Sequence, residues 1–575
     1  MKDFSYFQMR AFLYEREIEK TVEFKLQELG DLWFCDRKNA KRKLRKFEKV
    51  GKYDYEPGVG RGKPSRISFV DSFQREVEKA VIECVRNDQL EDIIQFFQLP
   101  IPQSWIAQVS KEVQQLIGLQ SPNHSKDILR TIVTNKIATL DPLCSSIDLE
   151  QYCIQQLGDT LTVYDHETDS VKPHLSYRWV AEEQYTQWTF FLRKGVVFHH
   201  HRKLTSEDVE YTFNRFKKEN SPMKWLVQDI EKIECISPFV VRFRLNQSNP
   251  FFVRFLCSCS LSILPKDERF EEHKWIGTGP FRLKKRTSTL IQLEAFDQYF
   301  LERPFLDEIE LHLVSNETRD AITYQINELD EIDPLFKKED VITGYRYLAF
   351  NFRRPTILHE RSFRHALYHL VDINKMWKDL GRTNIVEASS FVPWKSKKQV
   401  KNRSLIKKLL KESGYKGEGL TLYLQDLPQE KEEAQWFVKE AAAEGIQIDC
   451  IYFKMADFYS QRIDQEADLL FMGEASSFDH HMSFLDSFYN ESLMYRRFLD
   501  DEHIKNIENL LDKFKVEPDK ENRETLMDQV ERYLHNEHLI LFRYHPFVNR
   551  TVPSKIQNIR SASFGYDDFR QSWFD

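Results

Sequence analysis

The segment from Asp36 to Arg66 constrains the fold of this chain more than any other stretch. It combines a dense positive charge with the residues that begin and end a helix. From Arg37 to Arg66 the local net charge is +9, in a chain whose formal net charge is −7. The rest of the chain is therefore strongly acidic, and this asymmetry indicates that the segment alone meets a polyanion. The basic residues are Arg37, Lys38, Lys41, Arg42, Lys43, Arg45, Lys46, Lys49, Lys52, Arg61, Lys63 and Arg66.

A helix is predicted between Asp36 and Gly51. Asp36 can accept the free N–H groups at a helix start, and Gly51 stands where a left-handed residue closes one. Ala40, Leu44 and Phe47 recur at helical spacing and would face a core. Another face carries Lys38, Lys41, Arg42, Arg45 and Lys49. A helix with one apolar and one cationic stripe suits the major groove of DNA.

The flanking sequence predicts a winged helix-turn-helix around this basic helix. Upstream, Thr21–Trp33 predicts a short helix ending near Gly30, followed by a tight turn. Downstream, Tyr53–Tyr55 and Ile67–Val70 predict two short strands around a cationic Gly/Pro loop, as in a wing. The alternative is that the basic face is merely solvated, and the sequence leaves that open.

Most of these cations have a predicted role on double-stranded DNA. Near the start of the helix, side chains can reach base edges; Asn39 suits adenine and the arginines suit guanine. Later residues would hold phosphates, and the wing would lie over phosphates or in the minor groove. A single recognition helix binds weakly, so a dimer on DNA is also expected. The base-reading set is Arg37, Lys38, Asn39, Lys41 and Arg42; the phosphate set is Arg45, Lys46 and Lys49; the wing set is Arg61, Lys63 and Arg66.

The length of 575 residues predicts more than one domain. A winged-helix domain is expected over residues 1–71, a helical connector over 72–118, and a mixed α/β domain over 119–575. No run approaches the roughly 18 apolar residues that a membrane span needs, and the N-terminus has no signal-peptide core. The eight cysteines include no C-x-x-C pair, which fits a reducing cytoplasm. The expected strands include Ile128–Val133, Trp188–Phe191, Val240–Leu245, Leu290–Ala295 and Ile309–Leu313, and the expected helices Ser206–Lys217 and Arg361–Lys378.

An ordered series of motifs resembles the family-5 extracellular solute-binding proteins, the group that includes oligopeptide- and dipeptide-binding proteins. The resemblance covers nearly all of residues 126–575. The N-terminal region, with GRGKPSR at Gly60–Arg66, is similar to SgrR-type transcriptional regulators, which join a winged helix to such a domain. The family-5 motifs are Leu140-Asp141-Pro142, Leu192–Phe213, Gly277–Leu283, Glu302–Val314, Tyr347–Pro355, Arg361–Met376 and Phe564–Asp575.

The resemblance implies a bilobed, periplasmic-binding-protein-like (class II) domain after the winged helix. The second lobe would span approximately residues 346–535, and the chain would return to the first lobe at its C-terminus. Hinges are expected near Tyr345–Phe350 and in the last quarter of the chain. A small solute would bind in the cleft and draw the lobes together, and closure would alter DNA affinity.

The resemblance also indicates where ligand contacts belong. In peptide-binding relatives an acidic residue pairs with the amino terminus of the peptide, and the matching region is Leu469–Phe488. Ala475 occupies the usual acidic position, with Glu474 beside it and Asp479 later. Asn351 and Arg353 follow the expected hinge strand and are further candidates. The ligand class stays open between a peptide, a sugar and a sugar phosphate.

No enzyme, metal or cofactor is predicted. His199-His200-His201 and His480-His481 lack matching ligand spacing and are interpreted as solvated loops. No G-x-S-x-G elbow or Walker phosphate loop occurs. The favoured function is a cytoplasmic transcriptional regulator that senses a solute. The alternatives are a cytoplasmic oligopeptide- or solute-binding protein without DNA binding, and an RNA-binding regulator.

Overall fold

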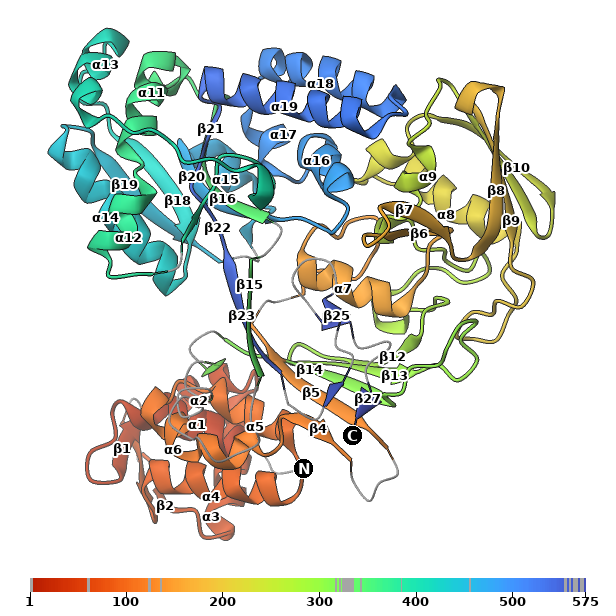
Figure 1. Cartoon of the computed structure of the whole chain (residues 1–575). Coiled ribbons are helices and arrows are strands. Elements are labelled where there is room, and N and C mark those ends of the chain that lie inside the picture. The colour runs from red at the N-terminus through yellow and green to blue at the C-terminus, as the bar shows by residue number, and fades with distance from the viewer. Residues whose placement is uncertain are drawn as a thin grey trace. The chain divides into compact units, whose positions relative to one another are not determined.

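The computed structural model of the chain (Figure 1) describes residues 4–58, 63–121, 126–134, 137–315, 318–319, 322, 336–341, 344–383, 385–454, 457–552, 556–557, 560–561, 567–568 and 573–574. The chain packs as two compact units. One holds residues 1–135, 284–293 and 306–334, and the other holds 136–283, 294–305 and 335–575. The domain boundaries expected at residues 71 and 118 stay a prediction.

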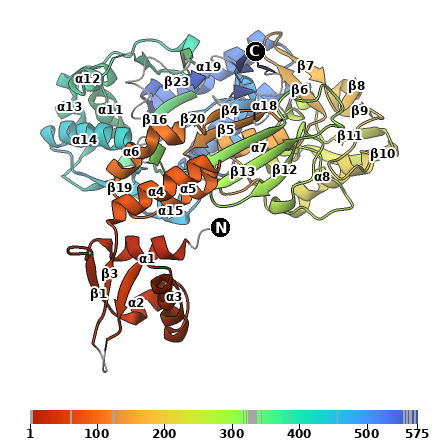
Figure 2. The same cartoon turned by 90° about the horizontal axis from the view of Figure 1, so that it is seen from below.

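The N-terminal elements form a winged helix (Figure 2). A three-stranded antiparallel sheet in the order β1-β3-β2 carries three helices. Thr21 pairs with Ser68 on one side of β3, and Tyr53 pairs with Phe69 on the other. The elements are α1 (Ser5–Tyr14), β1 (Thr21–Phe24), α2 (Leu26–Leu32), α3 (Arg37–Lys49), β2 (Tyr53–Glu56) and β3 (Ser65–Phe69).

The start of the helix predicted over Thr21–Trp33 was wrong. Thr21–Phe24 is strand β1, and only Leu26–Leu32 is helical. Within β1, Val22 and Phe24 are buried while Glu23 is exposed, the two-residue alternation of a strand against a core. Four residues are too few for this alternation to stand out against a helical pattern.

The connector helices share one hydrophobic core with the winged helix. They are α4 (Phe73–Arg86), α5 (Leu90–Phe97) and α6 (Gln103–Gln114). In this core Arg10 of α1 is fully buried. Its guanidinium donates to Asp71 O (2.7 Å) and Glu17 Oε1 (3.1 Å), contacts the Glu76 carboxylate on α4, and lies 4.0 Å from the centre of the Phe69 ring.

A five-stranded sheet follows in the order β12-β13-β14-β5-β4. Its central strands β5 and β14 run parallel, with Ile128 opposite Glu308. Arg130 of β5 donates to Glu310 of β14 (2.8 Å) and pairs with Asp88 in the turn between α4 and α5. This ion pair attaches the connector to the sheet. The strands are β4 (Gly118–Gln120), β5 (Ile128–Val133), β12 (Phe281–Arg286), β13 (Leu290–Ala295) and β14 (Glu308–Leu313).

The segment between β5 and β12 builds a second antiparallel sheet, β10-β11-β9-β8, and a small hairpin, β6-β7. Its strands are β6 (Thr162–Asp165), β7 (Ser170–Pro173), β8 (Ser176–Glu182), β9 (Gln187–Leu192), β10 (Ile230–Ser237) and β11 (Val240–Leu245). Its helices are α7 (Asp148–Leu157), α8 (Ser206–Lys218) and α9 (Phe252–Phe255).

Residues 344–545 form a five-stranded sheet, β19-β18-β20-β16-β21, with helices around it. The expected helix over Arg361–Lys378 is two helices, because the Asp372 side chain caps a new one. The strands are β16 (Gly344–Phe350), β17 (Val386–Glu387), β18 (Leu420–Gln425), β19 (Ile448–Phe453), β20 (Leu469–Ala475), β21 (Ile540–Phe542) and β22 (Tyr544–His545). The helices are α11 (Arg361–Leu370), α12 (Ile373–Asp379), α13 (Ile406–Ser413), α14 (Pro428–Ala443), α15 (Gln461–Glu466), α16 (His480–Tyr489), α17 (Met494–Phe498), α18 (Asp501–Val516) and α19 (Lys520–Glu537).

The hinge expected at Tyr345–Phe350 lies inside β16, which hydrogen-bonds to β20 and β21. A position bonded on both sides is a poor hinge. The chain enters and leaves residues 344–545 through a paired ribbon instead, β15 (Phe336–Val341) with β23 (Phe547–Val552). Short strand pairs complete the C-terminus: β24 (Ile556–Gln557) with β27 (Trp573–Phe574), and β25 (Arg560–Ser561) with β26 (Asp567–Asp568). In the described part of the chain, no helix has the length and apolar character needed to cross a membrane.

Candidate nucleic-acid interface and ligand site

Helix α3 is positioned by local signals in the sequence. The Asp36 carboxylate accepts the backbone N–H of Asn39 at 2.7 Å, which caps the helix, and Gly51 follows the helix end with a φ of +72°. Ala40, Leu44 and Phe47 are buried against the core. This fixes the rotation of the helix and turns its cationic face outward.

The exposed face of α3 carries most of the predicted DNA-contacting side chains. The Arg37 guanidinium donates to Gln27 Oε1 on α2 (2.8 Å), so one predicted base-reading group is held at the junction of the two helices. Lys43, which had no predicted role, lies 5.0 Å from the centre of the Trp33 ring. In the wing, Lys63, which precedes β3, and Arg66, on β3, are exposed, and Arg61 lies outside the described residues. The exposed cations of α3 are Arg37, Lys38, Arg42, Arg45, Lys46 and Lys49, with Asn39 and Lys41 partly exposed.

All four predicted ligand residues have partners within the protein, beginning with Asn351 and Arg353. Asn351 is fully buried, and its amide donates to the backbone oxygens of Asp464 (2.9 Å) and Ala467 (2.8 Å). Arg353 pairs with Asp501 at 2.7 Å. These contacts favour structural roles, and their ligand assignment stays a prediction.

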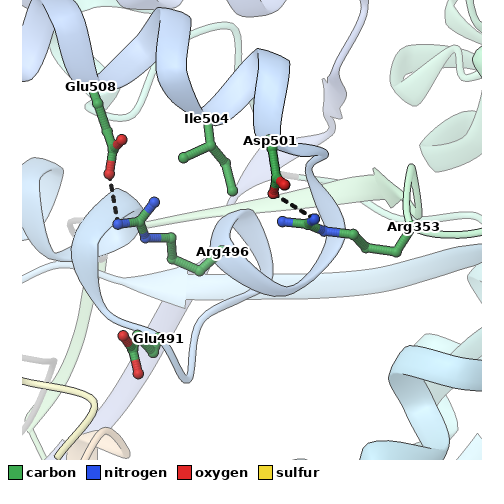
Figure 3. Close-up of a pocket in the computed structure, with 6 residues that line it drawn as sticks. All are labelled: Arg353, Glu491, Arg496, Asp501, Ile504 and Glu508. Atoms are coloured by element: carbon green, nitrogen blue, oxygen red, sulfur yellow. Dashed lines mark hydrogen bonds and ion pairs between the residues drawn. The ribbon is translucent and has the colours of Figure 1, made fainter.

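Arg353 also lines an open surface pocket of about 390 Å³ (Figure 3). Both arginines in this pocket are paired: Arg353 with Asp501, and Arg496 with Glu508 at 2.7 Å. Each ion pair neutralises the charges that would recognise an ionic ligand. The other lining residues are Glu491 and Ile504.

Glu474 is surrounded by hydroxyl groups, and its ligand assignment also stays a prediction. It lies opposite Tyr345 in the β16–β20 pairing. Its oxygens accept hydrogen bonds from Tyr345 (2.9 Å), Tyr347 (3.1 Å) and Ser487 (2.6 Å). Burial raises the pKa of Glu474 to about 7. The site therefore holds a carboxyl group that is poised between its two protonation states near neutral pH.

Two further carboxyl groups interact electrostatically with Glu474 and were not predicted. Burial raises the pKa of Asp486 on α16 to about 6. Burial also raises the pKa of Asp148, at the start of α7, to about 7; the Arg346 charge opposes the shift and the Glu474 charge adds to it. The Asp148 carboxyl is thus close enough to residues of β16 and β20 to feel their charges. We name Glu474, Asp486 and Asp148 the carboxyl cluster.

Asp479 has a different environment. It caps α16 by accepting the Met482 N–H at 3.0 Å, and it forms an ion pair with Arg254 of α9. Arg254 also pairs with Asp169 at 3.1 Å, and Lys520 pairs with that same carboxylate. The network links Asp169 and Arg254, which precede β15 in the sequence, to Asp479 and Lys520, which follow it. A cationic ligand at Asp479 would have to compete with Arg254 for this carboxylate.

The interpretation of the histidine runs as solvated loops was wrong for His199 and His481. His199 is buried; its Nδ1 accepts the Gly277 N–H at 3.2 Å and its Nε2 lies 3.1 Å from Gly279 O. His481 is fully buried near the start of α16. Only tertiary contacts distinguish these positions from exposed loops.

The carboxyl cluster predicts a pH dependence of stability. Because the folded-state pKa values lie above those of the unfolded chain, the folded state favours the protonated carboxyls. Their contribution is present below about pH 4 and is lost as the pH rises through about 7. We expect Glu474→Gln to reduce the fall in thermal midpoint between pH 5 and pH 8, measured by calorimetry. An unchanged pH profile in this variant would exclude Glu474 as the titrating group.

Two family models match the chain. "Bacterial extracellular solute-binding proteins, family 5 Middle" matches residues 170–495, and "Sugar transport-related sRNA regulator N-term" matches residues 5–118. The uncharacterized protein YhjP of Bacillus subtilis (strain 168) is 28% identical over 570 residues, covering 96% of each chain. The HTH-type transcriptional regulator SgrR of Pectobacterium atrosepticum is 26% identical over 343 residues, covering 58% of this chain and 59% of that protein.

Among solved structures, a dipeptide-binding protein from Pseudoalteromonas sp. SM9913, in complex with Met-Leu, is similar with a TM-score of 0.70 and 20% identity. The match covers 78% of this chain and 100% of that one. It confirms the predicted fold class, a winged helix followed by a bilobed solute-binding fold. The chain therefore belongs to the bacterial extracellular solute-binding proteins of family 5, and its N-terminal part is of the SgrR type.

Proposed function

We propose that this chain is a ligand-responsive transcriptional regulator that binds double-stranded DNA through α3 and the wing. The observation that carries the proposal is the exposed cationic face of α3. The opposite, apolar face of this helix is buried in the core of the winged helix, which leaves the cations facing outward. Two neighbouring copies would each place one α3 in a major groove. A DNA partner implies a cytoplasmic location, and binding and sensing require no catalysis.

The proposed ligand is a small solute that carries a positive charge, such as the amino group of a peptide. The support is the carboxyl cluster, in which three acidic groups resist ionisation. A bound cation would favour the ionised forms of these carboxyl groups. The negative phosphate of a sugar phosphate would disfavour the ionised forms and would be repelled by them. The cluster thus favours the peptide alternative over the sugar phosphate.

Ion pairs connect the winged helix and its connector helices to the five-stranded sheet of the same compact unit. Helices α4–α6 share a core with the winged helix, and Arg130 attaches the turn after α4 to the β5–β14 pair. Lys285 of β12 makes a further contact, 2.6 Å from Glu91 of α5. A change in the sheet would therefore move the winged helix with it. Ligand and DNA would each prefer one arrangement, and their effects would be reciprocal.

The central experiment measures binding of the full-length protein to duplex DNA from beside its own gene at two salt concentrations. We expect salt-sensitive binding, with log affinity falling by roughly 0.9 per phosphate contact for each unit of log salt. A peptide pool is expected to change the affinity and a sugar-phosphate pool is not. A matched pool of N-acetylated peptides tests the amine directly. If no duplex binds under any condition, the solute-binding protein without DNA binding becomes the better hypothesis.

Single substitutions on α3 should separate base reading from phosphate contact. Arg42→Ala is expected to cost about 1–3 kcal/mol on the operator and to relax sequence preference, because an arginine near the helix start can read guanine. Lys49→Ala, at the other end, should weaken operator and random DNA alike. Titration of both duplexes with both variants measures this difference. Equal losses on the two duplexes for Arg42→Ala would remove it from base reading.

A further inference from the structure

Two consecutive histidines converge on one carboxylate from a different helix. His480 and His481 open α16, and Glu524 lies on α19. The Nε2 atom of His480 lies 2.7 Å from Glu524 Oε1, and that of His481 lies 2.8 Å from the same oxygen. Consecutive helical residues project about 100° apart, so helix geometry alone does not produce this convergence.

The two imidazoles are fixed in place by packing. The His481 side chain has no solvent exposure, and its ring centre lies 5.2 Å from that of Phe514. The buried Nδ1 of His481 has no hydrogen-bond partner among the described residues, so Nε2 alone makes its polar contact. His480 and Glu524 keep exposures of 11% and 23%, which leaves a path from solvent.

The donor atoms are arranged for a shared cation. Each imidazole directs its Nε2 toward the same Glu524 oxygen, so two ring nitrogens and one carboxylate face one point. Imidazole nitrogens and carboxylate oxygens are common metal ligands in proteins.

We propose that His480, His481 and Glu524 bind a divalent first-row transition-metal ion, with Zn²⁺ as the reference case. The three donor atoms lie within 4.8 Å of one another. Two imidazole nitrogens and one carboxylate oxygen supply three positions of a tetrahedral zinc site and leave the fourth for water or another ligand. This donor set favours Cu²⁺, Ni²⁺ and Zn²⁺ over Mn²⁺ and Mg²⁺.

Lys395 takes the place of the metal charge in the metal-free protein. Its ammonium lies 2.5 Å from Glu524 Oε2 and 2.9 Å from Asp528 Oδ1. An incoming metal ion must compete with this ammonium for Glu524. Once displaced from Glu524, Lys395 can keep its ion pair with Asp528. The affinity for metal is therefore lower than the donor set alone would give, and it rises when a neutral residue replaces Lys395.

The test uses tag-free, full-length protein stripped with a chelator and titrated with ZnCl₂, and separately with NiCl₂, by calorimetry. We expect one equivalent to bind. Glu524→Gln and His480→Gln are each expected to weaken binding at least about tenfold, because each removes a ligand. Lys395→Gln should bind more tightly than the parent. His200→Gln is the matched control, because His200 also faces a carboxylate, Asp267 at 3.4 Å, but no second histidine of the described residues pairs with Asp267.

X-ray absorption on the zinc-loaded parent protein keeps the proposal falsifiable if a variant fails to fold. Two imidazole nitrogens with oxygen donors would support the site. No stoichiometric binding, binding unchanged in both Glu524→Gln and His480→Gln, or a coordination shell without imidazole would overturn it. Circular dichroism of the metal-free variants verifies that their folds are intact.

Discussion

Replacing Arg10 with Met is expected to lower the free energy of unfolding of the N-terminal core by about 3–5 kcal/mol, the usual cost of removing one partner from a buried ion pair. Arg10 is fully buried, and the carboxylate of Glu76 that it contacts is itself 9% exposed. Methionine fills a similar volume but leaves that carboxylate without its main charge partner. The Asp71 backbone oxygen also loses its hydrogen bond. The damage reaches both the winged helix and α4, because they share this core.

Hydrogen exchange of the backbone amides of α1 and α4 measures this loss locally. Arg75→Met is the matched control, since Arg75 is the neighbour of Glu76 on α4 but is 72% exposed, and such surface changes usually stay within about 0.5 kcal/mol. Adding Glu76→Gln to Arg10→Met should recover part of the stability by removing the uncompensated charge. A loss no larger than that of Arg75→Met would show that the buried ion pair contributes little.

Replacing Lys38, Lys41, Arg42, Arg45 and Lys49 together with Ala is expected to weaken duplex binding by a factor of about 10³ or more. These side chains supply both base and phosphate contacts in the proposed interface. The helix itself should persist, because Ala40, Leu44 and Phe47 still pack against the core and alanine is a strong helix former. The salt dependence should fall with the affinity, because fewer counterions are released on binding.

The matched control removes the same charge from another exposed surface. Lys397, Lys398, Lys407, Lys408 and Lys411 lie on or near α13 and are all exposed. Their replacement with Ala should leave duplex affinity within about twofold, because none of them belongs to the proposed interface and salt screens charges outside the contact. If both five-residue variants lose affinity equally, general charge rather than α3 accounts for binding. Fluorescence anisotropy with one labelled duplex measures both.

Local signals made much of the winged helix predictable from sequence. The bounds of α3 follow from Asp36 and Gly51, whose effects act within a few residues. Strand β1 escaped prediction because its alternation lasts four residues and its stability comes from pairing with β3, more than forty positions away. Likewise, the break between α11 and α12 depends on Asp372 capping a new helix inside one continuous helical pattern.

The candidate sites were less predictable because their partners are distant in sequence. Glu474 could be proposed from a resemblance, but its bonds to Tyr345 and Tyr347 depend on the register of β20 against β16. The alternation of tyrosines in β16 was a signal that both share one face. Nothing near His480 and His481 in the sequence points to Glu524, since only the packing of α16 and α19 brings the three together.

The contact of Arg130 with Asp88 and Glu310 limits the ways in which a ligand could change the DNA affinity of the winged helix. When a DNA-binding domain is joined by a flexible linker, the length of the linker sets its effective concentration at the DNA. Here Arg130 ties the connector helices of the winged helix to the β5–β14 pair, so linker length has no role. A ligand could then act only by changing the orientation or separation of the DNA-binding helices. For two copies on one operator, that is the separation of two α3 helices, which must match one turn of DNA, about 34–36 Å. Operators with one base pair inserted between their half-sites should therefore change the effect of the ligand on DNA affinity.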